Sequence, residues 1–64
     1  MKDFEYIENY YLKQNDIIKL VKNGVLYCVI SYTDNGIMLL NVLKNKSRLI
    51  FRNDYPKIYR KINS

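Results

Sequence analysis

The chain has 64 residues, of which 48% are apolar, and its formal net charge is +5. We predict a single domain over residues 1–64, because a chain of this length buries only about 60% of its unfolded surface and forms one small core. A single cysteine and the absence of histidine exclude a disulfide framework and the usual zinc sites. Apolar burial must therefore supply the stability, and a homodimer, which would bury more, is left open.

Residues 1–14 are predicted to form an N-terminal α-helix and a connector. Phe4, Ile7 and Tyr11 fall at helical spacing, and Asp3 precedes them as an N-cap. A helix this short is unstable alone in water, so its apolar stripe must dock on the remainder of the domain.

The same segment bears on location. It lacks the apolar core and the small-residue cleavage site of a signal peptide. No apolar run in the sequence approaches the roughly 20 residues of a membrane span. Together with the lone cysteine, which is typical of a reducing compartment, this predicts a cytoplasmic protein without a membrane partner.

Residues 16–43 predict a three-stranded antiparallel meander. The two glycines of the chain stand in Asn-Gly dipeptides, at 23–24 and 35–36, between β-branched and aromatic runs. This pattern is the strongest short-range indication of a hairpin. Two-residue turns at these places would pair Ile18 with Val29 and Val29 with Val42. Both faces of the meander would then be apolar, so the helix, a second chain or curvature into a barrel must cover the second face.

The last third of the chain completes a small barrel in this prediction. Five short strands, with tight hairpins in the middle and a turn before the last strand, resemble an SH3-like barrel in topology. The predicted fold is therefore mainly β, a five-stranded antiparallel SH3-like barrel over residues 16–62 with a short N-terminal α-helix. Its final elements are a polar loop at 44–47, a strand at 48–52, a turn at 53–56 and a strand at 57–62.

The sequence shows no catalytic constellation. It has no histidine to act as a base, its serines have no motif context, and its carboxylates form no evident pair. Both glycines are assigned to turns, so neither is left for a phosphate-binding loop. We therefore predict that the protein is not an enzyme and uses no metal or cofactor.

Positive charge is concentrated in the C-terminal half. Residues 1–34 carry a net charge of −1 and residues 35–64 carry +6, an asymmetry that indicates an anionic partner. Lysine and arginine contact phosphates, and aromatic rings stack on unpaired bases. In the last strand, alternation places a lysine, a tyrosine and a second lysine on one face. The predicted nucleic-acid-binding residues are Lys44, Lys46, Arg48, Arg52, Tyr55, Lys57, Tyr59, Arg60 and Lys61.

Two functions compete for this surface. The favoured one is a small basic protein that binds DNA or RNA, in a regulatory role. The alternative is a factor from a phage or mobile element that binds and modulates an acidic host protein. Lys, Asn, Ile and Tyr, whose codons are AT-rich, make up nearly half of the chain, which indicates the genome of a low-GC bacterium or of its phages and mobile elements. In this alternative, an exposed apolar sheet face would form the interface with the host protein. A third interpretation is that the lysines only protect an edge strand from pairing.

Overall fold

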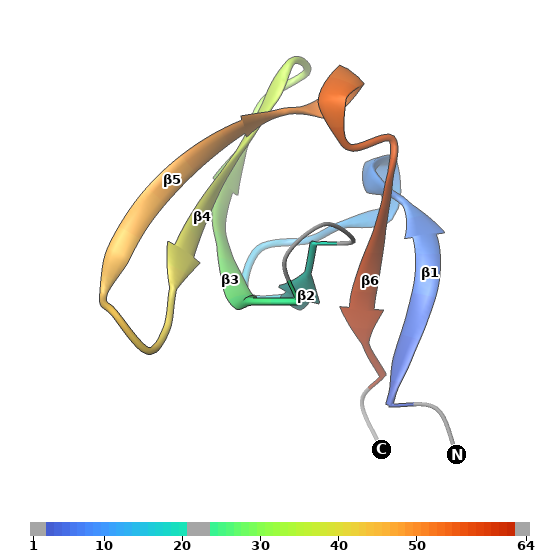
Figure 1. The fold of residues 1–64 in the computed structure, drawn as a ribbon. Coiled ribbons are helices and arrows are strands. Elements are labelled where there is room, and N and C mark those ends of the chain that lie inside the picture. The colour runs from blue at the N-terminus through green and yellow to red at the C-terminus, as the bar shows by residue number, and fades with distance from the viewer. Residues whose placement is uncertain (1–2, 21–23, 63–64) are drawn as a thin grey trace.

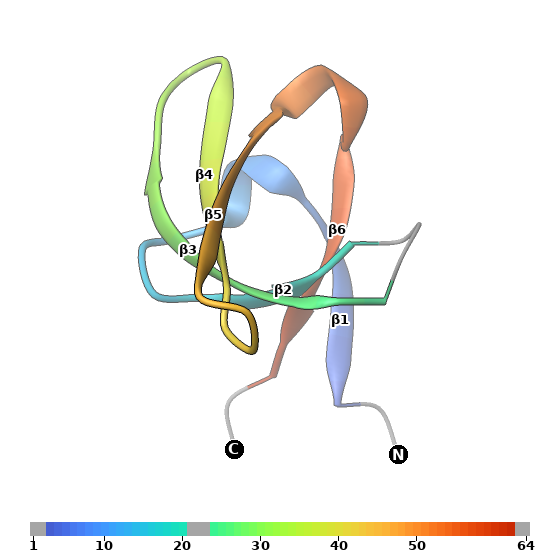
Figure 2. The ribbon, with the colours of Figure 1, turned by 60° about the vertical axis from the view of Figure 1, so that its left-hand side comes forward.

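The computed structural model describes residues 3–20 and 24–62. These residues form one antiparallel six-stranded sheet in the order β1-β6-β2-β3-β4-β5. The sheet is strongly curved, so that β3, β4 and β5 stand across from β1 and β6 (Figure 1), as the turned view also shows (Figure 2). The elements are β1 Phe4–Glu8, the 3-10 turn η1 Asn9–Tyr11, β2 Ile17–Lys19, β3 Leu26–Tyr32, β4 Gly36–Asn41, β5 Lys46–Phe51, the 3-10 turn η2 Arg52–Asp54 and β6 Lys57–Lys61.

The core lies inside the curve of the sheet. It is built from alternate residues of the strands, as a sheet with one buried face requires. Ile58 of β6, for example, is fully buried between two neighbours that point outward. The buried apolar side chains are Leu12, Ile18, Leu20, Tyr27, Val29, Ile37, Leu39, Ile50 and Ile58.

The predicted N-terminal α-helix is wrong. Residues 4–8 form β1, which pairs antiparallel with β6 so that Phe4 lies opposite Lys61 and Glu8 opposite Lys57. A 3-10 turn follows, and none of the described residues is α-helical. A two- or three-turn helix is only marginally stable, whereas β6 offers a ladder of backbone hydrogen bonds to a segment rich in aromatic and β-branched side chains.

The SH3-like barrel is not confirmed, because the sheet is open. β1 and β5 are its two edges, and no ladder joins them in the described part of the chain. β6 pairs with β2 on one side and with β1 on the other. The added strand β1 therefore occupies the edge of β6 at which a five-stranded sheet could have closed on itself.

The meander is present, but its register differs from the prediction. Ile18 lies opposite Tyr27, a shift of two residues that keeps Ile18 and Val29 in the core. Val29 lies opposite Leu39 rather than Val42, and this odd shift turns β4 over, so that Ile37 and Leu39 are buried.

Two local features cause the change in the second hairpin. β3 has an irregularity between Val29 and Ser31, which adds a residue to one strand. The Thr33 hydroxyl accepts a hydrogen bond from the amide of Gly36 at 3.1 Å, so the turn centres on residues 34–35 and Gly36 begins β4. In the first hairpin, Asn23 of the predicted Asn-Gly turn lies outside the described residues, and Gly24 has a φ of 67°, which glycine adopts without steric cost.

Candidate nucleic-acid interface

The structure does not gather the predicted basic residues on one surface. Two arginines are held by other groups of the protein, three basic residues lie on and beside β5, and two lysines flank a tyrosine on β6. In the same order, these sets are Arg52 and Arg60, then Lys44, Lys46 and Arg48, then Lys57, Tyr59 and Lys61.

Arg52 is buried, with 8% of its surface exposed. Its Nε donates a hydrogen bond to the carbonyl of Thr33 at 2.8 Å, and its Nη1 donates to the carbonyl and the Oδ1 of Asn9 at 3.0 and 3.1 Å. In return, Nδ2 of Asn9 donates to the carbonyls of Arg52 and Tyr55. The guanidinium therefore joins η1, η2 and the β3–β4 turn, and its Nε and Nη1 could contact a phosphate only by giving up these bonds.

Arg60 is held by carboxylates. Its Nε and Nη2 contact Oε2 of Glu5 at 3.0 and 2.9 Å, and its Nη1 lies 3.6 Å from Oδ2 of Asp16. The Nη1 also donates to the carbonyl of Tyr11 at 2.9 Å. Two acidic neighbours compensate the positive charge, so Arg60 has little attraction left for a phosphate.

Arg48 is exposed and is oriented by two phenols. Its Nη1 donates to the hydroxyl of Tyr27 at 3.3 Å and its Nη2 to that of Tyr55 at 3.1 Å. The hydrogen bond to Tyr27 raises the pKa of the Arg48 guanidinium, so this contact favours the charged form of the group. Tyr55 also packs against the core, which makes its ring a support for Arg48 rather than an open stacking surface.

Arg48 and the β6 lysines lie on different faces of the sheet. Arg48 is opposite the buried Leu39, so it and Lys46 project from the core side of β5. Lys57 and Tyr59 flank the buried Ile58, so alternation along β6 places Lys57, Tyr59 and Lys61 on the outer side of the strand. The two basic groups cannot contact the same short stretch of a ligand.

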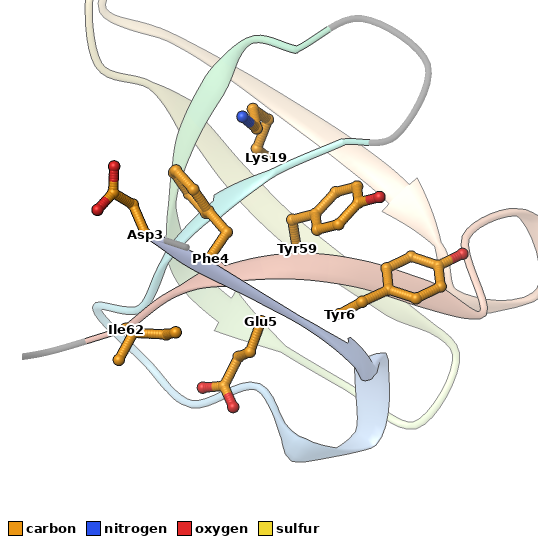
Figure 3. Close-up of a pocket in the computed structure, with 7 residues that line it drawn as sticks. All are labelled: Asp3, Phe4, Glu5, Tyr6, Lys19, Tyr59 and Ile62. Carbon is orange, nitrogen blue, oxygen red and sulfur yellow. The ribbon is translucent and has the colours of Figure 1, made fainter. Parts of the chain in front are cut away.

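The outer side of β6 carries the most developed site. The register of β1 with β6 places Tyr6 directly beside Tyr59, and β2 places Lys19 beside Tyr59 on its other flank. Figure 3 shows the rings of Phe4, Tyr59 and Tyr6 in a row, with Lys19 above them. We call this surface the aromatic platform; its members are Phe4, Tyr6, Tyr59, Lys19, Lys57 and Lys61.

Two rings of the platform contact each other, and two of its ammonium groups lie over rings. The ring centroids of Tyr6 and Tyr59 are 4.8 Å apart, with their planes inclined by 38°. Nζ of Lys19 lies 4.4 Å from the Phe4 ring centroid, and Nζ of Lys57 lies 5.4 Å from that of Tyr6. A shallow groove runs along Phe4, Tyr6, Lys19 and Tyr59 (Figure 3), and an adjoining groove shares Phe4 and Lys19 and reaches Lys61.

The lysines of the platform are weakly held. Both ion pairs found among the described residues belong to Arg60. An ammonium over an exposed ring is stabilised by only about 0.5–1 kcal/mol, so it can move to a phosphate at small cost. Two carboxylates reduce the positive charge of the platform, since Asp3 lines the groove and Glu8 lies opposite Lys57. The Glu5 carboxylate is bound to Arg60 and points to the other side of β1 (Figure 3).

Sequence reasoning found half of the platform. It identified Lys57, Tyr59 and Lys61 as one face of a strand, and the register agrees with that alternation. It missed Phe4 and Tyr6, because a helix over the first residues places no side chain beside β6. It missed Lys19, because the pairing of β2 with β6 joins segments far apart in the chain. The alternation of Phe4, Tyr6 and Glu8 with Glu5 and Ile7 was the available indication of a strand.

Comparison of the chain with protein-family models, with curated proteins and with solved structures finds no match. Within residues 3–20 and 24–62, no three acidic or cysteine side chains cluster as metal ligands do. The same residues include no helix of the length and apolarity that crossing a membrane requires. Function must therefore be inferred from the side chains of this chain alone.

Proposed function

We propose that this protein binds nucleic acid through the aromatic platform. One observation carries the proposal: Tyr6 and Tyr59 lie side by side on an outer sheet face, at 4.8 Å, among three lysines from β2 and β6. Phosphates attract such lysines, and bases stack on such rings. The strand order from β6 to β5, with η2 before β6, supports an open variant of an SH3-like barrel to which β1 is added.

The residues have distinct proposed roles. Lys19, Lys57 and Lys61 contact phosphates, while Tyr6 and Tyr59 contact bases. Lys44, Lys46 and Arg48 face elsewhere, so they raise the encounter rate through long-range attraction. Arg52, Tyr55 and Arg60 hold the scaffold through the hydrogen bonds described above.

The salt dependence of binding tests the proposal. Three phosphate contacts predict a slope of log K against log salt of about −2 on single strands, whereas seven predict about −5. Between about 50 and 200 mM salt, three contacts correspond to a roughly 20-fold loss of affinity. We expect Lys57→Ala to make the slope shallower by about 0.7, as measured by fluorescence anisotropy with a labelled oligonucleotide.

Lys13→Ala is the matched control, because Lys13 is exposed on the connector between η1 and β2. It should leave the slope unchanged. No binding of any oligonucleotide at 50 mM salt would refute the proposed function. A slope that Lys57→Ala leaves unchanged would move the binding surface away from the platform, to Lys44, Lys46 and Arg48.

A second function, binding of an acidic protein, is favoured by a different observation. Leu49 and Phe51 are 52% and 56% exposed on the edge strand β5. Lys46 and Arg48 lie on the same strand. An acidic partner could add a strand to this edge and cover the apolar side chains. This is the interaction that a factor from a phage or mobile element would use against a host protein.

Substitutions in β5 separate the two functions. Leu49→Asp and Phe51→Asp should abolish capture of a protein partner and leave oligonucleotide binding unchanged, because neither residue belongs to the platform. Lys57→Ala should have the opposite effect. Loss of oligonucleotide binding in the β5 variants, with the fold retained, would contradict the assignment of nucleic-acid binding to the platform.

A further inference from the structure

We infer that the aromatic platform selects unpaired bases, so that its ligand is a single strand of nucleic acid rather than a duplex. The inference rests on the proposed function and adds the form of the ligand to it. It depends on three properties of the surface: the exposure of the rings, their spacing and the distribution of charge around them.

A base can stack on the outward faces of the Tyr6 and Tyr59 rings but cannot enter the space between the two rings. Tyr6 is 51% exposed, and Tyr59 lies beside it across the β1–β6 ladder. A base inserted between two rings needs centroids roughly 7 Å apart, twice the stacking distance of about 3.4 Å. The observed 4.8 Å is too short. Bases must therefore lie on top of the tyrosines, which requires that they leave their own helix.

A duplex cannot use this surface well. Its bases are stacked on one another, so only its phosphates would reach the platform, and there they would meet Asp3 and Glu8 as well as the lysines. For a single strand the same carboxylates are useful, because they can accept hydrogen bonds from the amino groups of splayed bases.

The size of the platform matches a short stretch of strand. Lys57 and Lys61 stand four residues apart on β6, which is about 13 Å at 3.3 Å per residue. Tyr59 lies between them, and Tyr6 and Phe4 extend the row on β1 (Figure 3). Aromatic side chains on a sheet of this kind stack two or three bases, and the lysines at the two ends are placed to hold the flanking phosphates.

Oligonucleotides that differ only in their bases test the inference. A labelled 12-residue deoxythymidine strand is compared with an abasic strand of the same length and charge, with a 12-base-pair duplex and with a uridine strand, all at about 50 mM salt. We expect the thymidine strand to bind at least tenfold more tightly than the abasic strand and the duplex, because each stacked base contributes roughly tenfold or more. The uridine strand shows whether DNA and RNA are equally good sources of unpaired bases.

Variants locate the stacking. Tyr59→Ala should lose about tenfold in affinity for the thymidine strand and change little towards the abasic strand, while Tyr59→Phe, which keeps the ring, should bind like the parent. Tyr11→Ala is the control, since Tyr11 is exposed and lies outside the platform. If Tyr59→Ala does not fold, as judged by circular dichroism, the pair Tyr6→Ala and Tyr6→Phe makes the same comparison.

Equal affinity for the thymidine and abasic strands would overturn the inference, and so would tighter binding of the duplex. Both results would leave the proposed function in place, because binding through phosphates would still be seen. If none of the oligonucleotides binds, the proposed function itself fails and the inference fails with it.

Discussion

Replacement of Arg52 by alanine should cost this protein a large part of its stability. The guanidinium donates three hydrogen bonds, to the Thr33 carbonyl and to two oxygens of Asn9. Removal of a buried donor costs about 1–3 kcal/mol for each acceptor left unsatisfied. Because 8% of the residue surface reaches solvent, water will satisfy part of this need, and we expect a total of about 3 kcal/mol.

That loss is large for a domain of this size. At about 0.05–0.15 kcal/mol per residue, the whole free energy of unfolding is roughly 3–10 kcal/mol. A loss of 3 kcal/mol corresponds to a fall in Tm of about 12–24 °C. The measurement is thermal and urea unfolding followed by far-ultraviolet circular dichroism, with the free energy of unfolding compared at one temperature.

Two further variants make the result specific. Arg48→Ala removes a guanidinium that is exposed and bonded to two hydroxyls, and it should cost no more than about 0.5 kcal/mol. Arg52→Lys keeps the charge but loses the planar fork, so its stability should lie between those of the parent and Arg52→Ala. The reasoning is refuted if Arg52→Ala stays within about 0.5 kcal/mol of the parent, or if Arg48→Ala is equally damaging.

Three other substitutions follow from the packing. Ile58→Val, at a fully buried position, should lower the urea midpoint by the equivalent of about 0.5–1.5 kcal/mol with an unchanged m value; no shift would show that β6 is loosely packed. Gly36→Ala should cost about 1–3 kcal/mol, because a Cβ there would lie 3.2 Å from Cδ1 of Leu49 and 3.3 Å from the carbonyl oxygen of Ile50; a neutral effect in the same titration would show that β5 can move aside. Arg60→Ala should cost at most about 1 kcal/mol, and less in 1 M salt, because its ion pairs are partly solvated; a cost that does not change with salt would contradict an electrostatic role.

The sequence predicted those parts of the fold that depend on neighbouring residues. Runs of β-branched and aromatic residues indicated the strands that became β2, β3 and β4, and alternation of side chains indicated those that became β5 and β6; both are local properties of the chain. The Asn-Gly dipeptides indicated the hairpins. The register of the second hairpin escaped prediction because the Thr33 hydroxyl and the irregularity near Ser31 moved the turn, and an odd shift inverts every later side chain of the strand.

The remaining features depend on partners far along the chain. Phe4, Ile7 and Tyr11 fit a helix almost as well as Phe4 and Tyr6 fit a strand, and only pairing with β6 decides between them. In the predicted strand at 48–52, Arg52 pointed outward on the same side as Arg48. In the structure this strand ends at Phe51, and η2 directs the Arg52 side chain towards Asn9. No local pattern connects Asn9 with Arg52, so the sequence could not separate the structural arginine from the exposed one.

The ladder between β1 and β6 has a consequence for the order of folding. Phe4 pairs with Lys61, so this ladder closes a loop of about 57 residues, at an entropic cost of about 3.5 kcal/mol. Such a contact forms late, after the local hairpins, and an edge strand held in this way is among the first segments to open. Amide hydrogens of β1 should therefore exchange faster than those of β3 and β4. A ligand that bridges Tyr6 and Tyr59 would tie the two strands together and slow that exchange, so that recognition and the last step of folding become one event.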